Sequence, residues 1–218
     1  MKLISWFLDL LFPRKCVFCR NLLDSLETKI CDDCSTSLPK TEGEIRKLHF
    51  CAEAFSLFYY EGLVPDSIHR FKFSGMQHYS RVYGMLLAEE ILRRRIPFDV
   101  ISFVPVSKKR RRERGFDQSE LLAQAVGKEL GVPVIRCLTK IRNNPAQSGL
   151  QDSAARAANV LGVYGSYRPE RYSGKRILLI DDVLTTGATV GECCATLQVA
   201  GAGEIRCITV AAARKIYK

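Results

Sequence analysis

One short segment limits what this chain can fold into more than any other. Residues 177–189 read ILLIDDVLTTGAT: four apolar residues, two carboxylates, two more apolar residues and a hydroxyl-rich turn with one glycine. The apolar run predicts a buried strand, and Ala188–Ala200 predicts a helix directly after the turn. Open α/β sheets bind their ligands at the carboxyl ends of such strands. We therefore expect an α/β domain with its binding site at this turn.

The turn has the chemistry of an anion site. Backbone N–H groups at a helix N-terminus bind phosphate, and Gly187 allows the backbone to approach a ligand closely. The threonines of the turn add hydroxyl donors. Asp181 and Asp182 can accept hydrogen bonds from a ribose diol or orient a hydrated Mg²⁺. The segment thus predicts a sugar-phosphate site; the alternative is an ordinary surface turn that happens to carry this sequence.

The chain after residue 50 alternates strands and helices, which predicts a parallel sheet flanked by helices. Asp117, three residues before Glu120, is expected to cap a helix. The region 140–174 is expected to be a loop with one short helix. The predicted strands are Ala52–Tyr60, Asp99–Val106, Val132–Arg136, Arg176–Asp181 and Glu204–Ala211, and the predicted helices are Tyr79–Arg95, Gln118–Leu130 and Ala188–Ala200.

The first 50 residues differ in composition from the rest. Two C-x-x-C pairs, Cys16 with Cys19 and Cys31 with Cys34, are separated by eleven residues. Four thiolates in two such knuckles can close a tetrahedral, structural Zn²⁺ site, which would let a segment too small for its own core fold. The alternatives are unligated thiols or a redox C-x-x-C. We expect a zinc-ribbon-like module at residues 1–50, a main domain at 51–218, and a buried Cys51.

Residues 1–13 have apolar side chains at helical spacing and predict a short amphipathic helix. We do not interpret them as a signal peptide, because Asp9 interrupts the apolar run and no small-residue cleavage site follows. No stretch of about 20 apolar residues predicts a membrane span. We therefore expect a cytoplasmic protein. Its lysines and arginines exceed its acids by ten, which favours polyanionic partners such as nucleic acid or phosphorylated small molecules.

The segment 177–189 resembles the signature of type I phosphoribosyltransferases at every position. The resemblance implies that fold, and 5-phosphoribosyl 1-diphosphate with Mg²⁺ as the ligand. It implies that Asp181 and Asp182 act as the catalytic residues and hold the ribose hydroxyls. The residues that it implies for the 5-phosphate are Thr185, Thr186, Gly187, Ala188 and Thr189.

Other segments are similar to the ComF family, and with the paired cysteines the likeness covers essentially the whole chain. Residues 105–118 (PVSKKRRRERGFDQ) are close to its P-…-RRGFNQ stretch, and residues 147–159 contain its Q-x-x-L…R-x-x-N pattern. Three positions depart from the family: Asp117 replaces the usual Asn, Glu113 an Arg, and Asn144 a common Thr. These departures bear on the fine geometry of substrate binding and not on the fold.

The run 107–114 (SKKRRRER) carries six positive charges and one negative. We expect a loop that reaches over the carboxyl edge of the sheet. The resemblance implies that this region holds the pyrophosphate group, through Val104, Pro105, Arg112 and Arg114. The alternatives are a solvated charge run or a contact with nucleic acid. The basic-aromatic cluster Arg70–Phe73 similarly predicts either stacking on single-stranded bases or a half-buried strand edge.

These features support function hypotheses from two classes. The first is an enzyme, a phosphoribosyltransferase of the glycosyltransferase class. The second is a DNA-handling factor, because ComF members are associated with natural transformation; it implies DNA uptake, single-stranded DNA and other competence or DNA-processing proteins as partners. A third alternative is a nucleobase-salvage or amidophosphoribosyl-type transferase without a DNA role. The sequence has no readable code for the acceptor.

Overall fold

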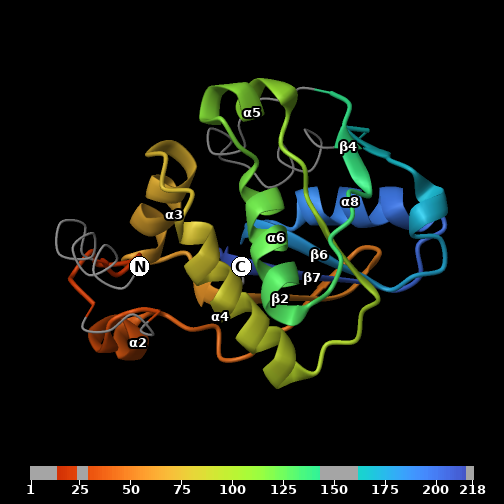
Figure 1. Ribbon diagram of the computed structural model, residues 1–218. Coiled ribbons are helices and arrows are strands. Elements are labelled where there is room, and N and C mark those ends of the chain that lie inside the picture. The colour runs from red at the N-terminus through yellow and green to blue at the C-terminus, as the bar shows by residue number, and fades with distance from the viewer. Residues whose placement is uncertain (1–13, 24–28, 143–161, 215–218) are drawn as a thin grey trace.

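A computed structural model describes residues 14–23, 29–142 and 162–214 of the chain (Figure 1). Its centre is a five-stranded sheet in the order β1-β2-β7-β6-β3. The last four of these strands run parallel, and β1 pairs antiparallel with β2. This confirms the predicted parallel sheet. The strands are β1 (Arg46–Leu48), β2 (Cys51–Tyr59), β3 (Val100–Phe103), β6 (Ile177–Leu184) and β7 (Ile205–Ala212).

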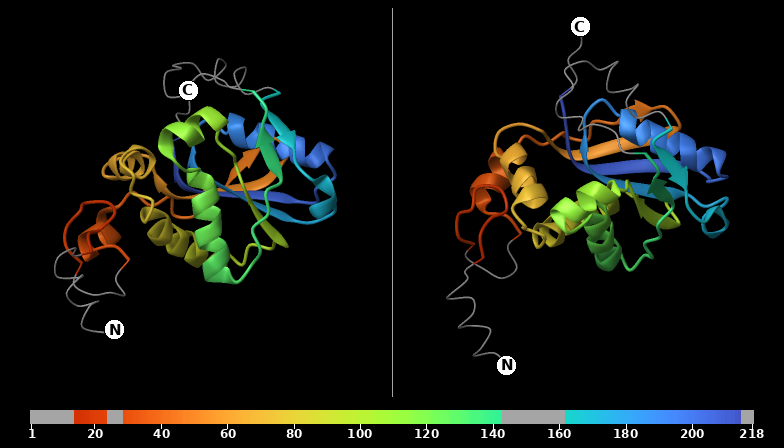
Figure 2. Two further views of the ribbon diagram at one scale, coloured as in Figure 1. Left: turned by 45° about the horizontal axis from the view of Figure 1, so that its top comes forward. Right: turned by 90° about the horizontal axis from the view of Figure 1, so that it is seen from above.

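Helices cover both faces of the sheet, as Figure 2 shows. Three helices lie on one face and α8 lies on the other. The three are α3, α4 and α6. The bounds of α6 are those predicted, and α4 ends one residue before the predicted end. Ala88 and Ile91 of α4 are buried as expected, but Leu92 is exposed. The bounds are α3 (Val64–Phe73), α4 (Tyr79–Arg94), α6 (Gln118–Leu130) and α8 (Ala188–Val199).

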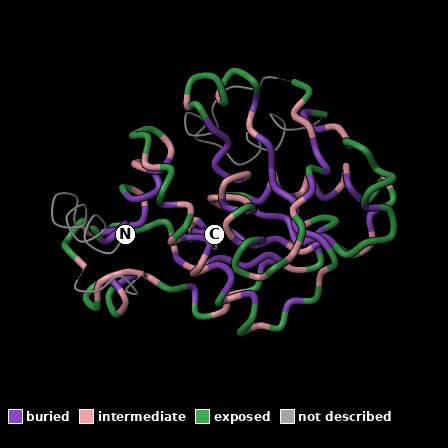
Figure 3. Tube along the Cα trace, viewed as in Figure 1, coloured by how far each residue is buried: buried purple, intermediate pink, exposed green. Residues whose placement is uncertain are grey.

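A hydrophobic core lies on each face of the sheet, and β6 contributes side chains to both. It can do so because successive side chains of a strand point to opposite faces. Leu178 and Ile180 pack into the core beneath α4 and α6, whereas Ile177 and Leu179 pack into the core beneath α8. All four are fully buried, as the purple trace through the centre of Figure 3 illustrates. The next two residues of β6, the acid pair, are only partly buried, because the strand leaves the core there.

Three elements differ from the sequence prediction. The basic run forms a helix, α5 (Lys108–Arg114), and not a loop, because the Ser107 hydroxyl accepts a hydrogen bond from Arg110 N and caps it. The cluster Arg70–Phe73 is the end of α3 and not a strand edge. Residues 132–136 form no strand beyond an isolated bridge at Val134.

A second, two-stranded sheet stands apart from the first. β4 (Leu138–Lys140) and β5 (Tyr164–Ser166) pair antiparallel, and a short 3-10 helix, η2 (Pro169–Arg171), follows. Part of the region predicted as a loop, residues 164–166, therefore forms a strand. The segment 147–159 that resembles the ComF pattern, Asn144 and the predicted helix at residues 1–13 lie outside the described residues.

The N-terminal module packs into the main core. Among its described residues, 14–23 and those from 29 onward, it contains one helix, α2 (Asp32–Ser37). Phe18 is buried, and its ring lies 5.3 Å from that of Phe58 and 5.9 Å from that of Tyr83. The module is thus joined to the sheet and to α4 by an aromatic cluster. Within the described ranges, no helix has the length and apolar character needed to cross a membrane.

Candidate ligand site and metal centre

The acid pair lies at the carboxyl end of β6. Ser119, at the start of α6, donates its hydroxyl to Asp181 Oδ1 at 2.8 Å, and the backbone N–H of Asp182 donates to the same oxygen at 2.9 Å. Burial, together with the adjacent Asp182 carboxylate, raises the pKa of Asp181 to about 7 against the opposing hydrogen bond from Ser119. The Asp181 carboxyl group can therefore exchange a proton near neutral pH.

Asp182 has a cationic partner that the sequence analysis did not identify. Lys72 Nζ, from the last turn of α3, lies 2.9 Å from each carboxylate oxygen of Asp182. The Lys72 and Asp182 side chains are only 21% and 14% exposed, so the ion pair is largely shielded from water. The basic-aromatic cluster Arg70–Phe73 was the sequence feature that could have indicated this residue. Lys72 reaches the end of β6 because the cluster is helical.

The turn after β6 needs glycine for two reasons. Gly187 has φ of 85°, in the left-handed region, and it is the N-cap residue of α8. A Cβ at this position would also lie 2.5 Å from Cδ2 of Leu48 in β1. The hairpin of β1 and β2 therefore packs directly on the turn.

The remaining turn residues present polar groups beside the acid pair. Thr185 and Thr186 are exposed, and Ala188 and Thr189 are partly exposed. The backbone N–H of Ala188 contacts Thr186 Oγ1 at 3.3 Å. The turn thus combines hydroxyl groups with the N-terminus of a 12-residue helix, an arrangement that suits a phosphate group.

The structure brings some of the predicted pyrophosphate residues to the same edge. The backbone N–H of Val104 donates to Ile180 O at 3.0 Å, so the end of β3, with Pro105 next to it, lies beside the acid pair. Both residues are buried. Arg112 is exposed on α5, and among the described residues no hydrogen bond or ion pair joins it to the acid pair.

Arg114 is held against the site by neutral groups. Its guanidinium lies 4.5 Å from the centroid of the Phe73 ring, and Nη1 donates to Gln118 Oε1 at 2.7 Å. Burial lowers the pKa of Arg114, while the nearby Asp182 carboxylate acts in the opposite direction. Gln118 Nε2 is buried and has no hydrogen-bond partner among the described residues. Its donor capacity is thus available for a ligand.

Lys140 of β4 is a further residue that the sequence analysis did not select. Its Nζ lies 3.5 Å from the Tyr164 hydroxyl. Burial, and then the Arg110 cation, lower the pKa of Lys140 to about 8, and the Asp181 and Asp117 carboxylates partly counteract this. Lys140 therefore belongs to the electrostatic surroundings of the acid pair. Nothing in its local sequence distinguishes it from a surface lysine.

Asp117 has the role that its position predicts. Its two carboxylate oxygens accept hydrogen bonds from Glu120 N at 3.3 Å and from Val106 N at 2.9 Å. It therefore caps α6 and also ties α6 to the segment that follows β3. An Asn at this position has only one acceptor oxygen, so the Asp lets the two contacts use separate oxygens.

The four paired cysteines form one cluster. The sulfur atoms of Cys16, Cys19, Cys31 and Cys34 all lie within 4.8 Å of one another, and Cys19 Sγ lies 3.4 Å from Cys31 Sγ. A tetrahedral ion with Zn–S bonds of about 2.3 Å requires sulfur–sulfur distances of roughly 3.8 Å. The donor set and its spacing therefore fit a structural zinc ion.

Local hydrogen bonds favour ionisation of one thiol of the cluster, Cys16, whereas the pKa values of Cys31 and Cys34 are raised. Burial opposes ionisation of the Cys16 thiol, but the backbone N–H groups of Cys31 and Cys19 outweigh it and lower the pKa of Cys16 to about 7. Cys51 is buried and donates to Glu53 O at 3.3 Å, away from the four-cysteine cluster. It is not a fifth member of that cluster.

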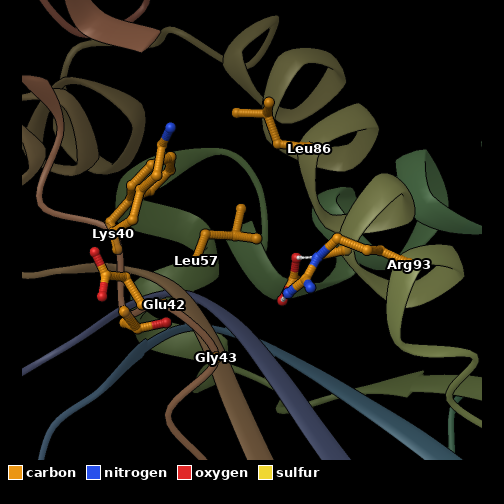
Figure 4. A pocket seen from close by; sticks show the side chains of 9 residues that line it. Lys40, Glu42, Gly43, Leu57, Leu86 and Arg93 are labelled. Atoms are coloured by element: carbon orange, nitrogen blue, oxygen red, sulfur yellow. Dashed lines mark hydrogen bonds and ion pairs between the residues drawn. The ribbon is translucent and has the colours of Figure 1, made fainter. Parts of the chain in front are cut away.

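A cavity of about 350 Å³ lies elsewhere, between the segment before β1 and α4 (Figure 4). Lys40 and Glu42 line it from the segment before β1, and Leu86 and Arg93 from α4, with Leu57 of β2 between them. None of the predicted ligand residues lines this cavity. It is therefore separate from the candidate site.

Comparison with known proteins identifies two domains. Residues 117–218 match the phosphoribosyl transferase domain, and residues 7–53 match the double zinc ribbon domain. Together with the sheet topology and the cysteine cluster, these matches confirm the predicted fold class: a type I phosphoribosyltransferase fold with an N-terminal zinc ribbon. The domain boundary near residue 50 stays a prediction.

Three relatives are similar to the chain. Competence protein ComFC of Streptococcus pneumoniae is 29% identical over 94% of this chain and 93% of its own length. Competence protein F of Haemophilus influenzae is 25% identical over 89% of this chain and 95% of its own length. DNA utilization protein YhgH of Salmonella typhi is 30% identical over 64% of this chain and 63% of its own length.

Proposed function

We propose, from the premise that this chain belongs to the ComF family, that it binds 5-phosphoribosyl 1-diphosphate at the carboxyl end of β6. We further propose that this binding serves the handling of single-stranded DNA during DNA uptake, together with other competence or DNA-processing proteins. The names of the relatives, competence protein and DNA utilization protein, support this role. We also propose a cytoplasmic location, since cysteines that are not paired in disulfide bonds suit a reducing compartment.

One observation carries the ligand assignment. Two adjacent carboxylates lie near the end of a buried strand, and a hydroxyl-rich turn begins after two further residues. The side chain of Leu48 occupies the place that a Cβ at Gly187 would need. The roles follow from the chemistry of each group. The turn residues Thr185–Thr189 bind the 5-phosphate, and Asp181 and Asp182 accept hydrogen bonds from the ribose hydroxyls.

The diphosphate end of the ligand lies toward α5 in this proposal. Arg114 is the main contact, because its fork-shaped guanidinium binds phosphate through two hydrogen bonds. Val104, Pro105 and Arg112 complete the surroundings. The carboxylate oxygens of the acid pair suit Mg²⁺, which would arrive with the diphosphate and neutralise part of its charge.

The chemistry that we propose is group transfer without a covalent enzyme intermediate. Pyrophosphate departs from C1 of the ribose with the bonding electron pair, which leaves an oxocarbenium-like centre that a nucleophile captures. The chain contributes by positioning the ligand and by placing charge where charge develops. The site thus supports a phosphoribosyltransferase whose acceptor is not specified by these residues.

Isothermal titration calorimetry with phosphoribosyl diphosphate and Mg²⁺ tests the assignment. The Asp181→Asn/Asp182→Asn variant should bind at least about a hundredfold more weakly, because each carboxylate hydrogen bond contributes roughly 1.5–3 kcal/mol. Glu129→Gln, at the exposed far end of α6, is the matched control and should bind like the wild type. Undiminished affinity in the double variant would refute the site.

A further inference from the structure

The last turn of α3 contacts both the backbone of the first cysteine knuckle and the acid pair. Arg70 Nη2 donates to Val17 O at 2.9 Å and to Phe18 O at 2.7 Å. These two carbonyl groups lie inside the first cysteine knuckle, between Cys16 and Cys19. In Figure 2 α3 accordingly lies next to the N-terminal module. Arg70, together with the Ser67 hydroxyl, which also donates to Val17 O, therefore fixes the position of α3 relative to the knuckle.

Two residues further along, Lys72 makes the bidentate contact with Asp182 described above. Residues at positions i and i+2 of a helix point to nearly opposite sides. Arg70 and Lys72 therefore reach different parts of the molecule from one rigid turn of helix. Phe73 follows, and Arg114 stacks on its ring. The end of α3 thus lies between the knuckle and the candidate ligand site.

The charge of Lys72 matters for an anionic ligand. Two adjacent carboxylates repel a phosphorylated sugar, and a nearby cation offsets part of that repulsion. The pair is largely shielded from water, so this effect is stronger than for an exposed ion pair. Contact with both Asp182 oxygens also fixes the orientation of that carboxylate.

We propose that Lys72 is a positioning residue of the ligand site, and that Arg70 makes the position of Lys72 depend on the four-cysteine module. The inference rests on the proposed function. It follows that metal binding at the cysteines and ligand binding at the acid pair support each other. Because such coupling is reciprocal, the ligand should raise the affinity for zinc by the same factor as zinc raises the affinity for the ligand.

The first experiment measures the affinity for phosphoribosyl diphosphate with Mg²⁺ in zinc-loaded protein. Lys72→Met should bind about tenfold more weakly or worse, as loss of a charged hydrogen bond implies. Lys72→Arg keeps the charge and should recover most of the affinity, which a packing role alone would not explain. Lys128 is exposed near the C-terminal end of α6, away from the acid pair, and Lys128→Met should bind the ligand like the wild type.

The second experiment measures zinc affinity by competition with a chelator, with and without saturating phosphoribosyl diphosphate. In wild type the ligand should raise zinc affinity about fivefold or more, the lower range of known couplings. The same measurement is made on Lys72→Met and on Arg70→Met, with the ligand concentration raised until the site is saturated. In both variants the ligand should raise the zinc affinity less than about twofold.

The outcomes separate this inference from the proposed function. If the wild type binds no phosphoribosyl diphosphate, the proposed function fails, and this inference fails with it. If the wild type binds the ligand but Lys72→Met binds equally well, only the positioning role is overturned. If the ligand leaves the zinc affinity of the wild type unchanged, the coupling through Arg70 is overturned.

Discussion

At the scale of single residues, Gly187 shows how backbone conformation and packing act together at the site. Its positive φ disfavours any side chain, and Leu48 occupies the space that a Cβ would need. Other glycines of the chain have a similar φ but open space around them. Gly131, for example, has φ of 66° at the end of α6 and no neighbouring atom near a Cβ position.

We expect Gly187→Ala to destabilise the protein more than Gly131→Ala does. Both substitutions strain the backbone, but only the first forces Leu48 away, which adds roughly 1–3 kcal/mol of overpacking. Urea denaturation of the two variants measures the difference. Gly187→Ala should also weaken phosphoribosyl diphosphate binding, since the turn shifts. Equal loss of stability in both variants would contradict the packing argument.

At the scale of elements, the basic run becomes a rigid helix because both of its ends are fixed. Ser107 caps its start, and Gly115, with φ of 80°, ends it. Arg114 faces Phe73 and Gln118, whereas Lys108, Lys109 and Arg112 are exposed. Arg114 is therefore held in one orientation by its neighbours, whereas the exposed cations face solvent and are available to a polyanion, either a diphosphate group or a nucleic acid strand.

Replacing Lys108, Lys109 and Arg112 together by Gln should weaken single-stranded DNA binding. Each phosphate contact contributes about −0.7 to the slope of log affinity against log salt for single strands, so the slope should become shallower by up to about 2. Fluorescence anisotropy with a labelled oligonucleotide over a salt series measures this. A control with three other exposed lysines, Lys47, Lys128 and Lys175, changed to Gln has the same net charge. An identical slope in both triple variants would argue against α5 as the DNA contact.

At the scale of the whole molecule, the zinc ribbon is part of the main core. Phe18 stands between Phe58 of β2 and Tyr83 of α4, and Ser67 and Arg70 of α3 bind the backbone of the same knuckle. The metal therefore stabilises more than its own short segment. Loss of the ion should loosen the packing of α3 and α4 on the sheet.

Removal of zinc should lower the melting temperature of the whole chain, not of the module alone. Zinc binding contributes several kcal/mol to folding, so Cys34→Ser should shift the transition by roughly 10 °C or more. Differential scanning calorimetry should show one transition, moved downward. Asp33→Asn, next to Cys34 in α2, leaves the sulfur atoms in place and should melt within about 2 °C of the wild type. A separate early transition for the module, with the main transition unmoved, would contradict this.

The sequence by itself determined the features that depend on neighbouring residues. A strand, two acids, a turn and a helix are contiguous in residues 177–189, so their order in space follows from local geometry. The same holds for each C-x-x-C knuckle and for the Asp117 cap. In these cases the spacing of residues along the chain is enough to predict which of them lie close together, because the geometry of a helix, strand or turn fixes the distance between residues a few positions apart.

Only the tertiary structure decided which distant side chains complete the site. Lys72 and Asp182 are 110 positions apart, and Arg70 reaches carbonyl groups about 50 positions away. The rotation of α3 about its own axis decides which residue of the Arg70–Phe73 cluster faces the acid pair. The packing of the buried residues Ile68 and Phe71 sets that rotation. Local pattern contains no information on that rotation, because it is fixed by contacts with strands and helices far along the chain.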